Sequence, residues 1–165
     1  MSDPVSPTTV NEREIADPSD PAAAEPVEPL GNPDPAEPGE PLADPAAAAA
    51  VIDGKQFAPV ANTASGEVGA TTVFHYHQDG KVIWAEYSGG AVVRGYLVGT
   101  RSGDRMSFRY SHLNIDLQTA SGVCETRIAV LDDGRVQFRE TWQWESRPEH
   151  GTSIVEELAA SGGRP

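Results

Sequence analysis

Glycine-containing turns divide most of this chain into short runs of residues that favour β-strands. From residue 51 onward, runs rich in Val, Ile, Thr, Tyr, Phe and Trp alternate with turn signals such as Asp79-Gly80, Gly89-Gly90 and Asp132-Asp133-Gly134. An Asp-Gly pair between two such runs is a strong signal for a two-residue hairpin. No window shows the 3.6-residue apolar period of an amphipathic helix. The pattern therefore predicts consecutive antiparallel hairpins.

We expect seven or eight strands that follow one another as a meander. A sheet of this kind tends to close on itself, because closure removes its unpaired edges. The expected fold is all-β, a small up-and-down barrel, with a half-open barrel or a sandwich as the alternative. A longer loop is expected at residues 113–121. The expected strands are 51–57, 72–78, 81–88, 91–99, 105–112, 122–131, 135–145 and 152–158.

The first 50 residues have a different composition from the rest. They hold 11 of the 25 acidic residues, 11 of the 14 prolines and none of the aromatic residues. Such a segment cannot bury enough apolar surface to offset the loss of chain entropy on folding. We expect a disordered acidic tail over residues 1–50, one β-barrel domain over 51–160 and a disordered end over 161–165. The alanine run at 46–50 favours one short helical turn before the domain.

The charge and the motifs that are missing exclude several function classes. A net charge of −13 disfavours nucleic acid and anionic membranes as partners. The single cysteine, Cys124, allows no intrachain disulfide, and no basic region with an apolar run opens the sequence. His75 and His77 share a strand face but have no third ligand, so no metal site is expected. We expect a cytoplasmic protein with no cofactor.

The turn positions fix strand pairing, and pairing decides which side chains share a face of the sheet. The Gly89-Gly90 turn pairs Tyr87 with Val92, and the Asp-Asp-Gly turn pairs Thr126 with Glu140. The separate hairpins give one mostly apolar face, which we assign to the interior. Its apolar members are Phe74, Tyr76, Ile83, Tyr87, Val92, Tyr96, Val98, Met106, Phe108, Ile128, Val130, Val136, Phe138 and Trp142.

A few polar residues fall on the same predicted inner face. A buried charge is costly unless it is paired, so Arg94 and Glu140 either bond to each other or bind a ligand. In the second interpretation, Arg94 holds an anion or carboxylate inside an aromatic-lined barrel. Cys124, on the same face, is expected to act as a small hydrophobe. The candidate ligand-binding residues are Arg94, Tyr96, Tyr110, His112, Thr126, Glu140 and Trp142.

A family resemblance extends over residues 54–157. It is carried by the segments GKQFAPVANTASGEV, TVFHYHQDG, YSGGAVVRGYLVG, GVCETRI, LDDGR, ETWQWES and GTSIVEEL. These resemble a family of small bacterial proteins often labelled N-acetylglutamate synthase, which implies transfer of an acetyl group from acetyl-CoA to glutamate. Residues 94–99 depart from the Arg/Gln-x-x-Gly-x-Gly/Ala spacing of common acetyl-CoA loops. The strand pattern also looks like the calycin-type barrels, which include lipocalins, avidins and fatty-acid-binding proteins.

Three functions follow as hypotheses. The first is a non-enzymatic barrel that binds a small anionic or aromatic molecule in its interior. The second is the acyltransferase that the family resemblance implies, which leaves enzymatic activity open. The third is a protein-interaction module, with the tail as a tether and a contact surface around His75, His77 and Trp84. The oligomeric state and the identity of a ligand are left open.

Overall fold

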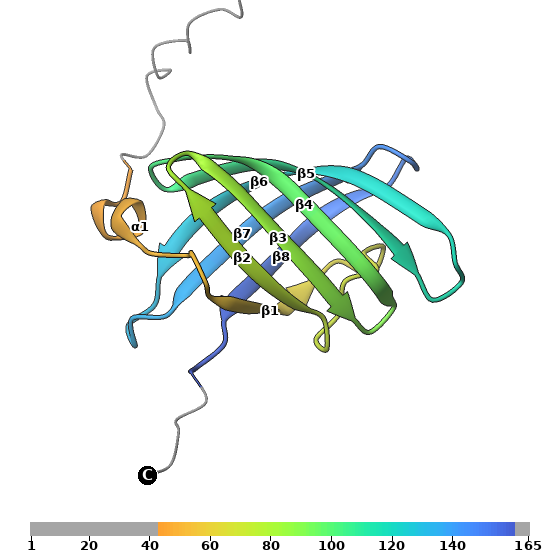
Figure 1. Ribbon diagram of the computed structural model, residues 1–165, viewed down its shortest axis with the longest axis horizontal. Coiled ribbons are helices and arrows are strands. Elements are labelled where there is room, and N and C mark those ends of the chain that lie inside the picture. The colour runs from red at the N-terminus through yellow and green to blue at the C-terminus, as the bar shows by residue number, and fades with distance from the viewer. Residues whose placement is uncertain (1–42, 161–165) are drawn as a thin grey trace, which may run out of the picture. The chain divides into compact units, whose positions relative to one another are not determined.

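The computed structural model describes residues 43–160 and contains a closed barrel of antiparallel strands (Figure 1). Each strand pairs with the next along the chain, and the last strand pairs with the first. The all-β meander barrel expected from the sequence is confirmed. The strands are β1 (Gln56–Asn62), β2 (Val73–Asp79), β3 (Val82–Gly89), β4 (Val92–Ser102), β5 (Arg105–Asn114), β6 (Thr119–Val130), β7 (Val136–Trp144) and β8 (His150–Glu157).

A short helix, α1 (Pro45–Ala49), precedes the barrel and lies at one of its ends (Figure 1). The side chain of Asp44 accepts a hydrogen bond from the Ala46 N–H at 2.9 Å, which caps the helix start. The helix therefore forms where the alanine run indicated a turn, within the segment expected to be tail. The predicted disorder of residues 1–42 and 161–165 lies outside the described residues. Within residues 43–160, no helix is long and apolar enough to cross a membrane.

The strand boundaries differ from the prediction most clearly at β1 and at the β5–β6 turn. β1 begins at Gln56, not at residue 51, and it contains Pro59 at an irregularity in its pairing with β8. Proline has no N–H for the ladder, so a bulge is where a strand tolerates it. The expected loop at 113–121 is only four residues long, because the Asn114 side chain accepts from the Asp116 and Gln118 N–H groups and closes a tight turn.

The predicted pairing is correct for one hairpin and preserves the faces in another. Thr126 pairs with Glu140 across β6 and β7, as the Asp-Asp-Gly turn predicted. On β2 and β3 the observed pairing is displaced by two residues, so that Tyr76 pairs with Ala85. An even displacement leaves every side chain on its predicted face.

The prediction for β4 was wrong, because the strand contains a bulge. Gly89 pairs with Val92, but Tyr87 pairs with Gly95, so β4 has one more residue than β3 between these pairs. An extra residue reverses the faces of everything that follows it. Val92 is buried as predicted, whereas Tyr96 and Val98 are exposed and Leu97 points inward.

The interior is packed tightly in the half next to α1. Phe57 lies flat against Phe138 with ring centroids 4.3 Å apart, and Tyr76 meets both rings edge-on. These residues, with Ile83 and Met106, are at most 1% exposed. The core thus fills the barrel interior in the α1 half, and the interior cavity lies toward the other end.

Candidate ligand-binding site

A cavity opens in the half of the barrel away from α1. The space available to the centre of a water-sized molecule is about 50 Å³, and all empty space there, including that open to solvent, is about 460 Å³. The first volume is room for a few water molecules or one small group. The lining residues are Asn62, Gly66, Glu67, Val68, Phe74, Tyr87, Leu97, Phe108, Tyr110, Cys124, Glu140, Trp142, Trp144 and Ser153.

Four aromatic residues of the wall are each paired with a glycine on the neighbouring strand. The Cα partners are Tyr87 with Gly95, Phe108 with Gly99, Tyr110 with Gly122 and Trp142 with Gly151. A Cβ on Gly95, Gly122 or Gly151 would overlap ring atoms of its aromatic partner, and a Cβ on Gly99 would overlap the Ser107 carbonyl and the Cα and Cβ of Phe108. Cross-strand glycines that receive aromatic rings are a known device for curved sheets. Here they let the rings lie back against the wall, which leaves the centre of the barrel open.

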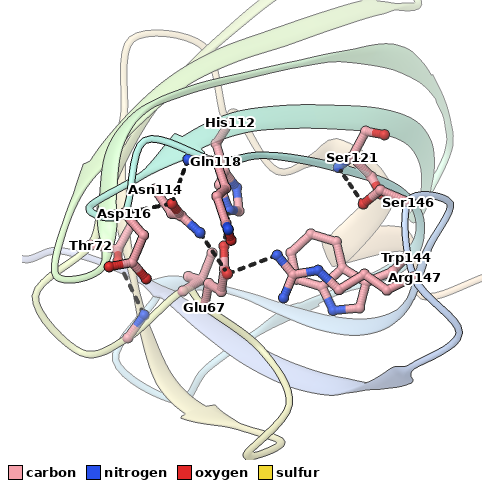
Figure 2. Close-up of polar contacts among 12 residues, drawn as sticks. Glu67, Thr72, His112, Asn114, Asp116, Gln118, Ser121, Trp144, Ser146 and Arg147 are labelled. Atoms are coloured by element: carbon pink, nitrogen blue, oxygen red, sulfur yellow. Dashed lines mark hydrogen bonds and ion pairs between the residues drawn. The ribbon is translucent and has the colours of Figure 1, made fainter.

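Residues 63–72, which we call the mouth loop, connect β1 to β2 across the open end. Figure 2 shows Glu67 of this loop between His112 and Asn114 on one side and Arg147 on the other. Its carboxylate lies 2.6 Å from His112 Nε2 and accepts hydrogen bonds from Asn114 Nδ2 at 3.1 Å and Arg147 at 2.8 Å. Arg147 also stacks on the Trp144 ring. One carboxylate therefore fastens the mouth loop to β5 and to the β7–β8 connection.

The surroundings of Glu67 keep its carboxylate ionised. Burial raises the pKa of Glu67, but the hydrogen bonds from His112, Arg147 and Asn114 outweigh that effect and bring it to about 2. The other ring nitrogen of His112, Nδ1, lies 3.1 Å from the hydroxyl of Tyr87. Because Tyr87 lines the cavity, this chain of contacts connects the cavity to the mouth loop.

One wall of the cavity carries three polar side chains in a row. Asn62 on β1 and Glu140 on β7 are both Cα partners of Ser153 on β8, so all three share the inner face. The Ser153 hydroxyl donates to Glu140 Oε2 at 2.6 Å. Burial raises the pKa of Glu140 to about 7, against the opposing effect of that hydrogen bond. The carboxyl group therefore takes up a proton much closer to neutral pH than an exposed glutamate does.

The structure separates the predicted site residues into three groups. Tyr110, Glu140 and Trp142 line the cavity. His112 and Thr126 are buried and each contacts a lining residue, Tyr87 and Cys124 respectively. Their role in binding stays a prediction.

The predicted inward position of Arg94 and Tyr96 was wrong, because both side chains lie on the outer face. Arg94 is exposed and donates to the Tyr96 hydroxyl at 3.4 Å. The β4 bulge turns both side chains away from the interior. The predicted Arg94–Glu140 pair therefore does not form.

The sequence interpretation missed the mouth loop and the first strand of the wall. Asn62, Glu67 and Ser153 were not among the candidates, because they belong to a loop and to strand ends whose register no tight turn fixes. A signal was present in the sequence, however. Gly95, Gly99, Gly122 and Gly151 lie inside strands, where a glycine often marks a close approach by another group.

Two further expectations concern cysteine and the outer face. Cys124 is buried at the cavity wall, and burial raises the pKa of its thiol well above the usual value, so it remains a neutral thiol. His77 stacks on Trp84 on the outer face, as predicted. Trp84 pairs with Val98, and the exposed Tyr96 lies beside them on β4. The use of this surface as an interaction site stays a prediction.

The chain is similar to a known protein family. Residues 50–158 match the family model described as avidin-like protein. No curated protein and no solved structure matches the chain. The calycin-type topology seen in the strand pattern fits this match and the closed barrel. The resemblance to proteins labelled N-acetylglutamate synthase receives no support, and the all-β fold differs from the mixed α/β fold of common acetyltransferases.

Proposed function

This chain belongs to the avidin-like family, and we propose that it binds a small molecule in the cavity beneath the mouth loop. Barrels of this family typically bind small ligands such as biotin. The observation that supports the proposal most directly is a buried polar atom that has no hydrogen-bond partner, on a residue of the cavity wall. The Oδ1 atom of Asn62 is the one buried side-chain nitrogen or oxygen within residues 43–160 that has no hydrogen-bond partner.

An unsatisfied buried acceptor costs roughly 1–3 kcal/mol in a folded protein. A barrel that only needed a stable core would fill this position with an apolar side chain. The aromatic rings and the few convergent polar groups around Asn62 are the usual composition of a small-molecule site. These features favour binding over a purely structural interior.

The cavity gives no support for an anionic ligand. The basis for that expectation was Arg94, which lies outside the barrel. None of the residues that line the cavity is a lysine, arginine or histidine. The hydrogen-bond acceptors that line the cavity therefore indicate the ligand class.

A matched pair of β4 variants tests whether the cavity is the binding site. The full chain is screened by thermal shift against a small-molecule panel that includes biotin. Leu97→Trp fills the cavity, whereas Val98→Trp adds the same group on the outer face. A ligand of the cavity should stabilise the wild type and Val98→Trp but not Leu97→Trp.

The test has a clear contrary result. If Leu97→Trp responds to the ligand as the wild type does, the ligand binds elsewhere and the proposal fails. Leu97→Phe serves as the milder variant if the tryptophan prevents folding. The ligand-free melting curve of each variant shows which of the two applies.

A further inference from the structure

The polar wall of the cavity offers hydrogen-bond acceptors without matching donors. Asn62 Nδ2 donates to the Val68 carbonyl at 2.6 Å, which fixes the orientation of the amide. Its Oδ1 is buried and left with no partner, and Asn62 is one of the residues that line the cavity. Turning the amide over would place two oxygens against each other. An N–H or O–H donor of a molecule in the cavity would satisfy this oxygen.

Glu140 adds a carboxyl group that has no cationic partner. Within the described residues its hydrogen bond comes from Ser153, and it takes part in none of the ion pairs. The second carboxylate at the cavity, Glu67, is already neutralised by Arg147 and its other partners. A half-buried carboxylate facing an apolar space is costly unless a cation joins it.

The opposite wall is suited to the same kind of ligand. Phe74 stacks on Tyr87 with ring centroids 4.6 Å apart, and Phe108 and Tyr110 continue the aromatic surface. Aromatic faces attract cations, and the attraction grows when water is excluded. A positively charged group held by Glu140 would therefore find favourable contacts on its other side.

We propose that the ligand of this cavity is a small organic nitrogen cation of the amine, amidine or guanidine class. Its N–H groups donate to the Glu140 carboxylate and to Asn62 Oδ1, and its carbon part lies against the aromatic wall. The inference rests on the proposed function, because it names the ligand class of the same cavity. With about 50 Å³ free, the buried part is a small head group, and a larger ligand extends out past the mouth loop.

Charge and pH should control binding together. A cation binds the ionised form of Glu140, and its pKa of about 7 means that this form disappears as pH falls from 8 to 5.5. Affinity for a cation should then fall by roughly tenfold or more over that range. A neutral donor of the same shape should show a much smaller dependence.

The test uses three probes of similar size on the full chain: methylguanidinium, neutral N-methylurea and anionic propionate. Binding is followed by NMR through the indole N–H signals of Trp142 and Trp144 at pH 8 and pH 5.5. Methylguanidinium should bind tightest at pH 8. Glu140→Gln should weaken it about tenfold or more and remove the pH dependence. Glu86→Gln, the same change at an exposed position on β3, should leave both unchanged.

The outcomes separate this inference from the proposed function. If propionate or N-methylurea shifts the indole signals at least as strongly as methylguanidinium, the ligand class is wrong but the cavity still binds. If neither these probes nor the wider panel reaches the cavity, both proposals fail. Should Glu140→Gln not fold, the wild-type comparison of probes and pH values decides the matter.

Discussion

The two ends of the barrel are covered in different ways. At the α1 end, all five N–H groups of Arg101 donate to neutral oxygens: the Ala47, Ala48, Ala50 and Gly103 carbonyls and the Gln78 side chain. At the mouth, the carboxylate of Glu67 gathers His112, Asn114 and Arg147. One end is held by a cation with neutral acceptors, and the other by an anion with charged and titratable donors.

This difference indicates which end is permanent and which can open. Ala47 and Ile52 have no exposed surface, so the α1 end is part of the core. Opening it would leave several backbone carbonyls and the buried guanidinium of Arg101 without their hydrogen-bond partners. The mouth loop instead covers a cavity, and its charged contact, Glu67, has an Arg147 partner that is about a third exposed. We therefore expect a ligand to enter the barrel at the mouth.

The largest expected effect is at the α1 end. Arg101→Ala should lower the free energy of unfolding by about 3 kcal/mol or more, since it removes every bond between β4 and the helix. Urea denaturation gives the loss. Hydrogen exchange at the amides of residues 46–54 should rise at the same time.

A milder variant tests the same end. Arg101→Lys keeps the charge but cannot supply the planar set of five donors, so it should recover only part of the stability. Wild-type stability in Arg101→Ala would show that the helix is held by its apolar contacts alone. The two ends would then not differ as described.

A smaller effect is expected at the mouth. Glu67→Gln should cost about 1–3 kcal/mol at pH 7, because it removes charge-assisted bonds to His112 and Arg147. The pKa of Glu67 is lowered from 4.5 to about 2 on folding, so the unfolded chain binds the proton more tightly. The contribution is complete above pH 4.5 and is lost as pH falls toward 2. Urea titrations between pH 3 and 7 measure it.

The control for Glu67 is another glutamate in an ion pair. Glu145→Gln breaks the exposed pair with Arg109 and should change stability by less than about 1 kcal/mol. Faster exchange of the mouth-loop amides in Glu67→Gln, with α1 unaffected, would sharpen the contrast between the ends. Equal acceleration at both ends would argue against independent covers.

The smallest effect is expected for Arg94, which the sequence analysis assigned to the barrel interior. Arg94→Ala should change stability by less than about 0.5 kcal/mol and leave ligand binding unaltered, since the side chain lies in solvent. Denaturation and the probe titrations above check both points. A loss like that of Arg101→Ala would mean that β4 has the face predicted from the sequence.

Local signals predicted the sheet well. Asp79-Gly80 and Asp132-Asp133-Gly134 each lie at a hairpin, and the predicted pairing of Thr126 with Glu140 is confirmed. Each of these features depends on a few neighbouring residues. The double glycine before β4 misled the prediction, because the turn sits one residue later and a bulge follows it.

The candidate site could be predicted only in part. Tyr110, Glu140 and Trp142 lie on strands whose neighbouring turns fix their faces, and all three reach the cavity. Asn62 and Glu67 were not predicted, because β1 pairs mostly with β8, whose residues lie 91 to 100 positions later, and the mouth loop has no regular pattern. The cytoplasmic location and the disorder of residues 1–42 stay predictions.

The sequence by itself determined an antiparallel meander of β-strands, because hairpins depend on turn chemistry and on alternation within short segments. Only the tertiary structure decided that Arg94 faces outward, that Arg101 holds α1, and that Glu67 fastens the mouth loop. These outcomes depend on a bulge and on bonds between residues 45 to 80 positions apart. Contacts of that kind exist only once the barrel has closed, so no local pattern encodes them.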